Sequence, residues 1–262
     1  MAGRRVLGQR TGVVEADAAP EGPDGTASQT GVASGLFRRP GPDESVSQIV
    51  HRYGFSAVAR VLGRMSVVKT LYCSLRFRAP IVIGRRTKLV LPRGARIRVR
   101  RGGAFLIGID QNHPRTSLLE IASGGLLSCD GIVSVCRGAK MVIGSAGSLS
   151  IGGGTYFNDG CTVMAFDHSS FGSGCAIAWN VTIVDTDMHR VVRDGEVSSP
   201  QRGYHIDNDV WIGAHAIILK GVTIGSRSVV AAGAVLSQDL PIGSLAAGNP
   251  ARIVDHDVTW LH

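Results

Sequence analysis

The feature that most constrains the fold is a six-residue repeat of large aliphatic side chains. Between residues 206 and 236 one such side chain occurs every six positions: Ile206, Ile212, Ile218, Ile224, Val230 and Leu236. Two positions before each of the last five lies a small or β-branched residue: Val210, Ala216, Val222, Ser228 and Ala234. A period of six fits neither an α-helix nor a simple alternating strand. It predicts stacked coils of short strands and turns, in which each strand points one large and one small side chain inward.

The same frame extends toward the N-terminus with interruptions. It reappears at Ile151, Phe157, Val163, Phe171, Ile177 and Ile183. The gap of eight before Phe171 predicts a two-residue insertion, and the gap of 23 before Ile206 predicts an excursion loop over roughly residues 187–204. The pairs Ile83-Gly84, Ile107-Gly108 and Ile143-Gly144 drift in phase. We therefore expect an all-β domain over residues 80–254 with irregular early coils, which the low aromatic content of 5% and the 35 glycines also favour.

The segments flanking this domain have different compositions. Residues 1–45 contain few large apolar groups and are predicted to be a disordered tail. Residues 46–79 form a basic helical segment, and 255–262 a C-terminal tail. Within 46–72, apolar residues recur at spacings of three and four: Val50, Tyr53, Ala57, Val61, Met65, Val68 and Tyr72. Such a stripe either packs on the β domain, which we favour slightly, or rests on an anionic membrane.

The net charge of +8 is unevenly distributed along the chain. Residues 46–103 hold 14 of the 28 Lys and Arg and no Asp or Glu, whereas residues 104–262 carry 9 basic and 14 acidic residues. The basic segment lacks interleaved stacking aromatics and any known binding motif, so we do not expect a nucleic-acid partner. It would favour peripheral contact with an anionic membrane face. No stretch is apolar enough to span a bilayer or to form a signal peptide, so a cytoplasmic location is expected, with the inner membrane face as the place that the basic segment favours.

The five cysteines show no metal-ligand or redox spacing. Cys73, Cys129, Cys136, Cys161 and Cys175 form no C-x-x-C pair. An odd count without a signal peptide favours reduced, packed thiols. We therefore expect no metal.

The C-terminal part carries a family resemblance. From Ile206 the sequence reads IDNDVWIGAHAIILKGVTIGSRSVVAAGAVLSQDLPIGSLAAGNPARIV, with the motifs V-W-I-G, A-x-G-A-V and A-G-N-P-A-R. It resembles the hexapeptide-repeat O-acetyltransferases of the galactoside/maltose type and their relatives that acetylate surface polysaccharides. The resemblance covers residues 145–254 well and 80–144 loosely. It implies a left-handed parallel β-helix, a homotrimer with active sites between subunits, acetyl-CoA as co-substrate, and a sugar or glycan acceptor.

The resemblance also implies roles for residues near the excursion loop. His189, in D-T-D-M-H, is expected to be the general base that takes the proton of the acceptor hydroxyl. Asp187 or Asp185 is expected to orient its imidazole, as triad carboxylates do, although a backbone carbonyl or an ordinary turn role stays open. Asp185 and Asn158 are expected to contact the acceptor. For Asn158, a turn-capping ladder is almost equally expected.

Other residues match the family's donor-binding positions. Trp211 is expected beside the pantetheine arm, and backbone groups of Ala178, Ala214 and Ala232 are expected to bond its amides. Ser237 and Gln238 match a donor-binding pair that is often Thr-Lys in relatives, and the lysine that would contact a phosphate is absent here. Arg252 is expected to pair with the CoA phosphates. Lys220 and Arg227 either assist or are solvated charges, His215 is interpreted as structural, and His168 has no assigned role.

The sequence therefore predicts an acetyl-CoA-dependent O-acetyltransferase. Two alternatives remain: the same fold acting on an amino acceptor, or a non-catalytic β-helix scaffold with a basic binding segment. The presence of both His189 and Arg252 argues against the scaffold, which would need neither.

Overall fold

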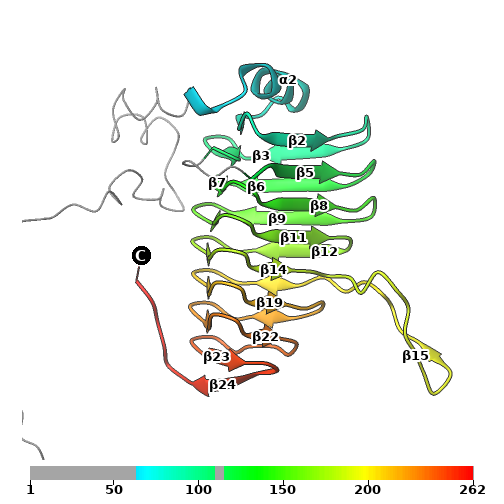
Figure 1. The fold of residues 1–262 in the computed structure, drawn as a ribbon, viewed down its shortest axis with the longest axis vertical. Coiled ribbons are helices and arrows are strands. Elements are labelled where there is room, and N and C mark those ends of the chain that lie inside the picture. The colour runs from blue at the N-terminus through cyan, green and yellow to red at the C-terminus, as the bar shows by residue number, and fades with distance from the viewer. Residues whose placement is uncertain (1–62, 110–114, 262) are drawn as a thin grey trace, which may run out of the picture. The chain divides into compact units, whose positions relative to one another are not determined.

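A computed structural model describes residues 63–109 and 115–261. From residue 81 the chain winds as a left-handed parallel β-helix whose coils stack along one axis (Figure 1). Each full coil adds one strand to each of three sheets, which we call sheets 1, 2 and 3 in the order the chain visits them. The first strand begins at Ile81, next to the start near residue 80 that the sequence predicts.

Sheet 1 contains β1 (Ile81–Ile83), β4 (Ala104–Ile107), β7 (Ile132–Val135), β10 (Tyr156–Phe157), β13 (Ala176–Ile177), β18 (Trp211–Ile212), β21 (Val229–Val230) and β23 (Leu245–Gly248), and β24 (Ala251–Asp255) closes it antiparallel to β23. Sheet 2 contains β2 (Thr87–Val90), β5 (Ser117–Ile121), β8 (Lys140–Ile143), β11 (Thr162–Ala165), β14 (Thr182–Ile183), β19 (Ile217–Ile218) and β22 (Val235–Leu236). Sheet 3 contains β3 (Arg96–Val99), β6 (Leu126–Asp130), β9 (Ser148–Gly152), β12 (His168–Phe171), β17 (His205–Ile206) and β20 (Thr223–Ile224).

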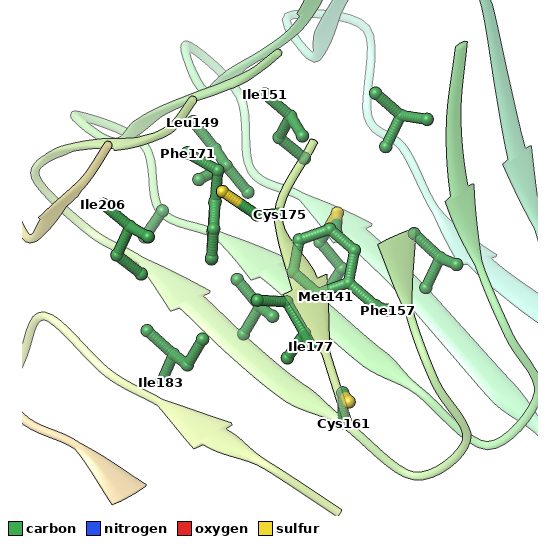
Figure 2. Packing of buried hydrophobic residues seen from close by; sticks show 14 of the residues in the cluster. Met141, Leu149, Ile151, Phe157, Cys161, Phe171, Cys175, Ile177, Ile183 and Ile206 are labelled. Atoms are coloured by element: carbon green, nitrogen blue, oxygen red, sulfur yellow. The ribbon is translucent and has the colours of Figure 1, made fainter. Parts of the chain in front are cut away.

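The predicted repeat positions form the core. All six large residues of the 206–236 repeat are buried, as are the small residues two positions before them. Figure 2 shows the middle coils, where Phe157 and Phe171 meet edge to face with ring centroids 5.0 Å apart. The predicted two-residue insertion is present as Phe166 and Asp167, between β11 and β12. The core of the late coils is thus built from the residues that the period of six selected.

The late turns repeat one backbone geometry. At the corner between sheets 1 and 2, Gly160, Asn180, His215 and Gly233 are the third turn residues of successive coils, and all have positive φ. The amide of His215 donates to the Trp179 carbonyl at 2.9 Å, and the amide of Gly233 donates to the Ala214 carbonyl at 2.8 Å. Each turn is therefore bonded to the turn of the preceding coil, and His215 lies at one of these turn positions.

The N-terminal helix differs from its prediction in position and orientation. α2 spans Val67–Phe77, after Ser66, whose hydroxyl accepts from the Lys69 amide at 3.4 Å. Residues 46–62 of the predicted helix lie outside the described residues. The preferred packing of the apolar stripe on the β domain is wrong for Val68 and Tyr72, because both are exposed. The helix instead turns a polar face toward β1, where Thr70 and Ser74 bond the backbone.

Most of the cysteines are packed in the interior, as predicted. All five are free thiols, and four of them, Cys73, Cys129, Cys161 and Cys175, are buried. Over residues 63–109 and 115–261, no helix combines the length and apolar character that crossing a bilayer requires.

Candidate functional site

The excursion loop leaves the β-helix between sheets 2 and 3. The chain departs after β14 and returns at β17, and its tip is a small hairpin of β15 (Val192–Arg193) and β16 (Glu196–Val197) (Figure 1). At the base of the loop, the amide of Asp187 donates to the Pro200 carbonyl at 2.8 Å. Thr186 and Gln201 form an isolated antiparallel β-bridge there. The two arms of the loop are therefore joined where they leave the coil, close to the predicted range of 187–204.

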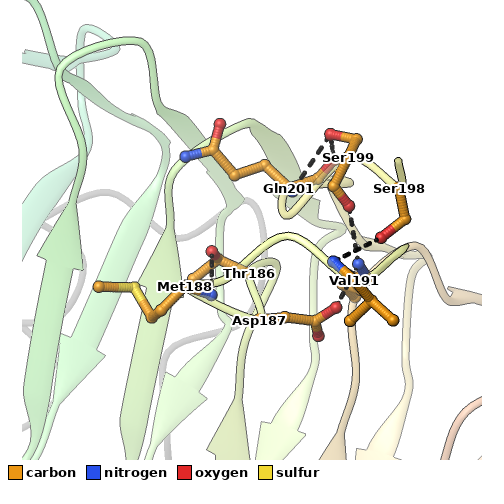
Figure 3. Close-up of polar contacts among 8 residues, drawn as sticks. Thr186, Asp187, Met188, Val191, Ser198, Ser199 and Gln201 are labelled. Carbon is orange, nitrogen blue, oxygen red and sulfur yellow. Dashed lines mark hydrogen bonds and ion pairs between the residues drawn. The ribbon is translucent and has the colours of Figure 1, made fainter. Parts of the chain in front are cut away.

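His189 lies just beyond this joined base. The preceding residue, Met188, has a left-handed backbone, and its amide donates to the Thr186 hydroxyl at 2.9 Å (Figure 3). The side chain of His189 is exposed, and among the described residues it has no hydrogen-bond or ion-pair partner. The arrangement fixes the backbone next to His189 and leaves its imidazole open to a ligand.

Asp187 has a lysine partner. Its carboxylate pairs with the ammonium group of Lys220, which also donates to the Ser199 carbonyl at 2.9 Å. Lys220 follows β19, which pairs with β14 in the next coil. The ion pair therefore links the excursion loop to the coil that follows it. The structure shows no contact between Asp187 and His189, so the orienting role of Asp187 stays a prediction.

Asp185 is an internal anchor in this chain. It is fully buried, and its carboxylate accepts from the amides of Phe166 and Asp167 and from the Ser169 hydroxyl. Burial raises the pKa of Asp185 above the ordinary aspartate value, and these donors oppose that shift. The carboxylate holds the two-residue insertion against the start of the loop. Because the Asp185 side chain is fully buried, its expected contact with the acceptor would require a rearrangement that exposes this carboxylate.

A second group of predicted residues lies at the corner between sheets 1 and 2. Asn158 and Ala178 are buried first residues of successive turns, while Ala214 is half-buried and Ala232 exposed. The amide of Ala178 donates to the Ile212 carbonyl, and the Ala214 carbonyl accepts from the Gly233 amide. Both hydrogen bonds join successive coils. The exposed turn residues at this corner are Trp179, His215, Ala232 and Gly233.

The remaining donor-binding candidates lie apart from one another. Trp211 begins β18 on sheet 1 and is 42% exposed. Arg252 is exposed on β24, where its guanidinium donates to the carbonyl of Ala251. Ser237 and Gln238 are exposed after β22, at the corner that also carries the excursion loop.

The structure therefore divides the predicted site into two groups. The loop residues with Ser237 and Gln238 lie between sheets 2 and 3, and the Asn158–Ala178–Ala214–Ala232 group lies between sheets 1 and 2. Sheet 2 separates the two corners. A single chain does not bring His189 and this alanine corner together.

Sequence reasoning missed aromatic and basic groups close to the predicted residues. Trp260, in the C-terminal tail, lies 6.2 Å from Trp211 between ring centroids, and its indole donates to the Asp209 carbonyl at 2.6 Å. Trp179 follows Ala178 and is 56% exposed, and the guanidinium of Arg115 reaches the next residue, Asn180, at 3.1 Å. The rarity of tryptophan, with three in the chain, was a signal that could have directed attention to these residues.

Comparison with known proteins identifies the repeat. Residues 203–238 match the model of the bacterial transferase hexapeptide (six repeats). The chain is 36% identical over 110 residues to a galactoside O-acetyltransferase of Escherichia coli, covering 41% of this chain and 53% of that protein. It is 51% identical over 49 residues to a 2,3,4,5-tetrahydropyridine-2,6-dicarboxylate N-acetyltransferase of Staphylococcus aureus, covering 19% of this chain and 20% of that protein.

These matches are partial, since the chain spans about half the length of the galactoside enzyme and a fifth of the other. A solved structure of the polysialic acid O-acetyltransferase OatWY aligns with 68% of this chain and 88% of its own, at 22% identity and a TM-score of 0.49. Residues 203–238, in the coils that follow the excursion loop, therefore carry hexapeptide repeats of the bacterial transferase type.

Proposed function

We propose that the protein is an acyltransferase that moves an acetyl group from acetyl-CoA to a hydroxyl of a sugar or glycan. The observation that carries the proposal is His189, whose side chain is exposed and has no partner among the described residues, on a loop whose base is fixed to a hexapeptide β-helix. The partial likeness to a galactoside O-acetyltransferase supports a sugar acceptor.

The chemistry requires a base because a sugar hydroxyl is a poor nucleophile at neutral pH. Neutral His189 takes the hydroxyl proton as the oxygen attacks the thioester carbonyl carbon. The carbon–sulfur bond then breaks, and the imidazolium returns the proton to the departing thiolate. No covalent enzyme intermediate is needed, and the histidine ends in its starting state.

A second copy of the chain completes the site in this proposal. The corner that carries the excursion loop and the corner that carries the alanines lie at opposite ends of the sheet 2 strands. One chain therefore cannot offer both corners to one ligand. In a homotrimer, the loop of one subunit would face the alanine corner of its neighbour. Trp211 and the backbone of Ala232 would then line the pantetheine arm, with Arg252 near the phosphates. The expected cytoplasmic location also stays a prediction.

A nitrogen acceptor is the second candidate. It is favoured by the 51% identity with an N-acetyltransferase over 49 residues. A neutral amine would lose its proton to the same histidine, so the base logic does not separate the two acceptors. The acceptor panel must therefore contain amino sugars beside neutral and acidic sugars.

The test is release of free CoA thiol from acetyl-CoA in the presence of that panel. We expect acceptor-dependent release that falls by about 10²–10⁴-fold in His189→Ala, the usual contribution of a general base. His256→Ala is the matched control, because His256 is also exposed and its side chain has no described contact. Equal activity of wild type and His189→Ala would refute the proposed mechanism, and failure of folded protein to bind acetyl-CoA would refute the donor.

A further inference from the structure

Helix α2 presents its polar side to the protein. Thr70 accepts from the Ile83 amide at 3.0 Å, and Ser74 donates to the Ile81 carbonyl at 3.0 Å and accepts from the Ile81 amide at 3.3 Å. Both partners are on β1, the edge strand of sheet 1. The hydroxyl groups thus satisfy backbone groups that a strand edge would leave open.

A few other groups complete the inner side of the helix. Cys73 is fully buried, and Phe77 packs partly against the core. Lys69 donates from its ammonium to the Thr87 carbonyl at 2.7 Å, and Arg76 donates to the Leu91 carbonyl at 2.7 Å. Hydrogen bonds to β1, to β2 and to the turn after β2 therefore hold α2 at the end of the β-helix (Figure 1).

The opposite side of α2 is apolar and exposed. Its members are Val67, Val68, Leu71, Tyr72 and Leu75, and we call them the α2 apolar face. Val68 is 79% exposed and Leu75 is 74% exposed. Single exposed apolar residues are ordinary, but five on one short helix mark an interaction surface. No described residue covers this face.

The segment that contains this face and the first coil is strongly basic. Residues 63–109 contain no acidic residue and twelve cations: Arg64, Lys69, Arg76, Arg78, Arg85, Arg86, Lys88, Arg93, Arg96, Arg98, Arg100 and Arg101. Those exposed near the helix and in the first coil include Arg78, Arg85 and Lys88. An apolar helix face next to a cluster of cations is the combination that anionic lipid surfaces bind.

We propose that the α2 apolar face inserts into the interfacial region of an anionic lipid bilayer, with the surrounding cations on the lipid headgroups. The helix would lie in the plane of the membrane, and the β-helix would extend away from it. The proposal does not depend on the acetyl-transfer reaction. It adopts the membrane alternative that the sequence left open, since the exposure of Val68 and Tyr72 contradicts the packing that we preferred.

Charge and polarity argue for this occupant over others. A second copy docked through the same face would bring two acid-free, cation-rich segments together, and their repulsion would oppose the contact. A nucleic acid would bind the cations but would leave the leucines in water. A bilayer with anionic headgroups satisfies both components at once.

The test is co-sedimentation of the full-length protein with vesicles of phosphatidylglycerol and phosphatidylcholine, and with phosphatidylcholine alone. We expect binding to the anionic vesicles that weakens with added salt, because surface charge attraction is screened. The double variant Leu71→Ser/Leu75→Ser should have an affinity for the anionic vesicles that is lower by a factor of roughly ten or more. A factor of ten corresponds to only about 1.4 kcal/mol of lost apolar burial. Ile242→Ser/Val254→Ser is the matched control, because both residues are exposed and lie in the last coils.

Each outcome decides the proposal. Loss of binding in the α2 variant with retention in the control supports it, provided that both variants keep the wild-type thermal transition. Equal binding of the α2 variant and wild type overturns it, as does a wild type that ignores anionic vesicles. A lower oligomeric state in the α2 variant without vesicle binding by wild type would assign the face to a second copy instead.

Discussion

The early and late coils share one architecture but differ in length. In sheet 1, Ile81 pairs with Phe105, 24 residues later, and Phe105 pairs with Val133, 28 residues later. In the late part, Trp211 pairs with Val229, 18 residues later. Early strands have three to five residues, whereas late strands have mostly two. The three sheets nevertheless continue without a break from one region to the other.

This difference shows which feature of the sequence defines a β-helix coil. Alternating inward residues within each strand keep the register, as in Ile81, Ile83, Phe105 and Ile107. The length of the turns is free to vary, because extra residues extend outward from the corner. A strict period of six is therefore sufficient for the fold, but it is not necessary.

The largest expected effect is a loss of stability on substituting glycines where adjacent coils approach closely. It tests whether the coils are packed as closely in the early region as in the late region. A Cβ at Gly84 would overlap the Gly108 carbonyl, and one at Gly213 would overlap the Ala232 amide nitrogen. Because these obstacles are backbone atoms, we expect Gly84→Ala and Gly213→Ala each to lose about 3 kcal/mol of unfolding free energy in urea denaturation. Gly63→Ala is the control, since its Cβ would meet no atom. A cost at Gly213 alone would mean that the early coils are looser.

The strict period explains which parts of the fold the sequence could predict. The late coils were predicted residue by residue, because each contributes the same inward pair at fixed spacing. In the early coils, turns of different length shift the phase, so only their rough start was predicted. The stripe on residues 65–72 showed amphipathicity, but amphipathicity does not say which face turns inward. That depended on the backbone groups of β1, which bond Thr70 and Ser74.

The candidate site was predictable only in part for a related reason. His189 was singled out by the family resemblance, at the point where the excursion loop leaves the regular repeat, and its role stays a prediction. The ion pair of Asp187 with Lys220 could not be predicted, since it joins residues from different coils across an irregular loop. The neighbourhood of Trp211 and Trp260 likewise depends on how the C-terminal tail folds back, which no periodicity specifies.

A smaller effect is expected from lengthening turns. Two glycines inserted between Ala214 and His215 should cost about 2 kcal/mol, because the His215–Trp179 and Gly233–Ala214 hydrogen bonds would break. The same insertion between Arg101 and Gly102 should cost only about 0.5 kcal/mol, since this exposed turn has room around Gly102. Thermal unfolding of the two variants measures the difference. Equal costs would contradict the view that the turn at Gly102 tolerates extra residues better than the turn at His215.

The smallest expected signal is thiol labelling, which compares the two regions without altering the sequence. Burial raises the pKa of Cys161 and Cys175 to about 12 and also raises that of Cys129. At pH 8 roughly one thiol in 10⁴ with a pKa of 12 is ionised, and the thiolate is the reactive form. We therefore expect iodoacetamide to modify the half-buried Cys136 first and to spare these three in the native protein.

The rate at which the buried thiols eventually react reports local opening of their coils. Cys129 belongs to an early coil, while Cys161 and Cys175 belong to the shorter middle coils that follow. If longer turns do not loosen the stack, peptide mass spectrometry should find similar slow rates for all three. Faster labelling of Cys129 than of Cys175 would show that the irregular coils open separately. The continuous sheets would then be a shared architecture with unequal stability along its axis.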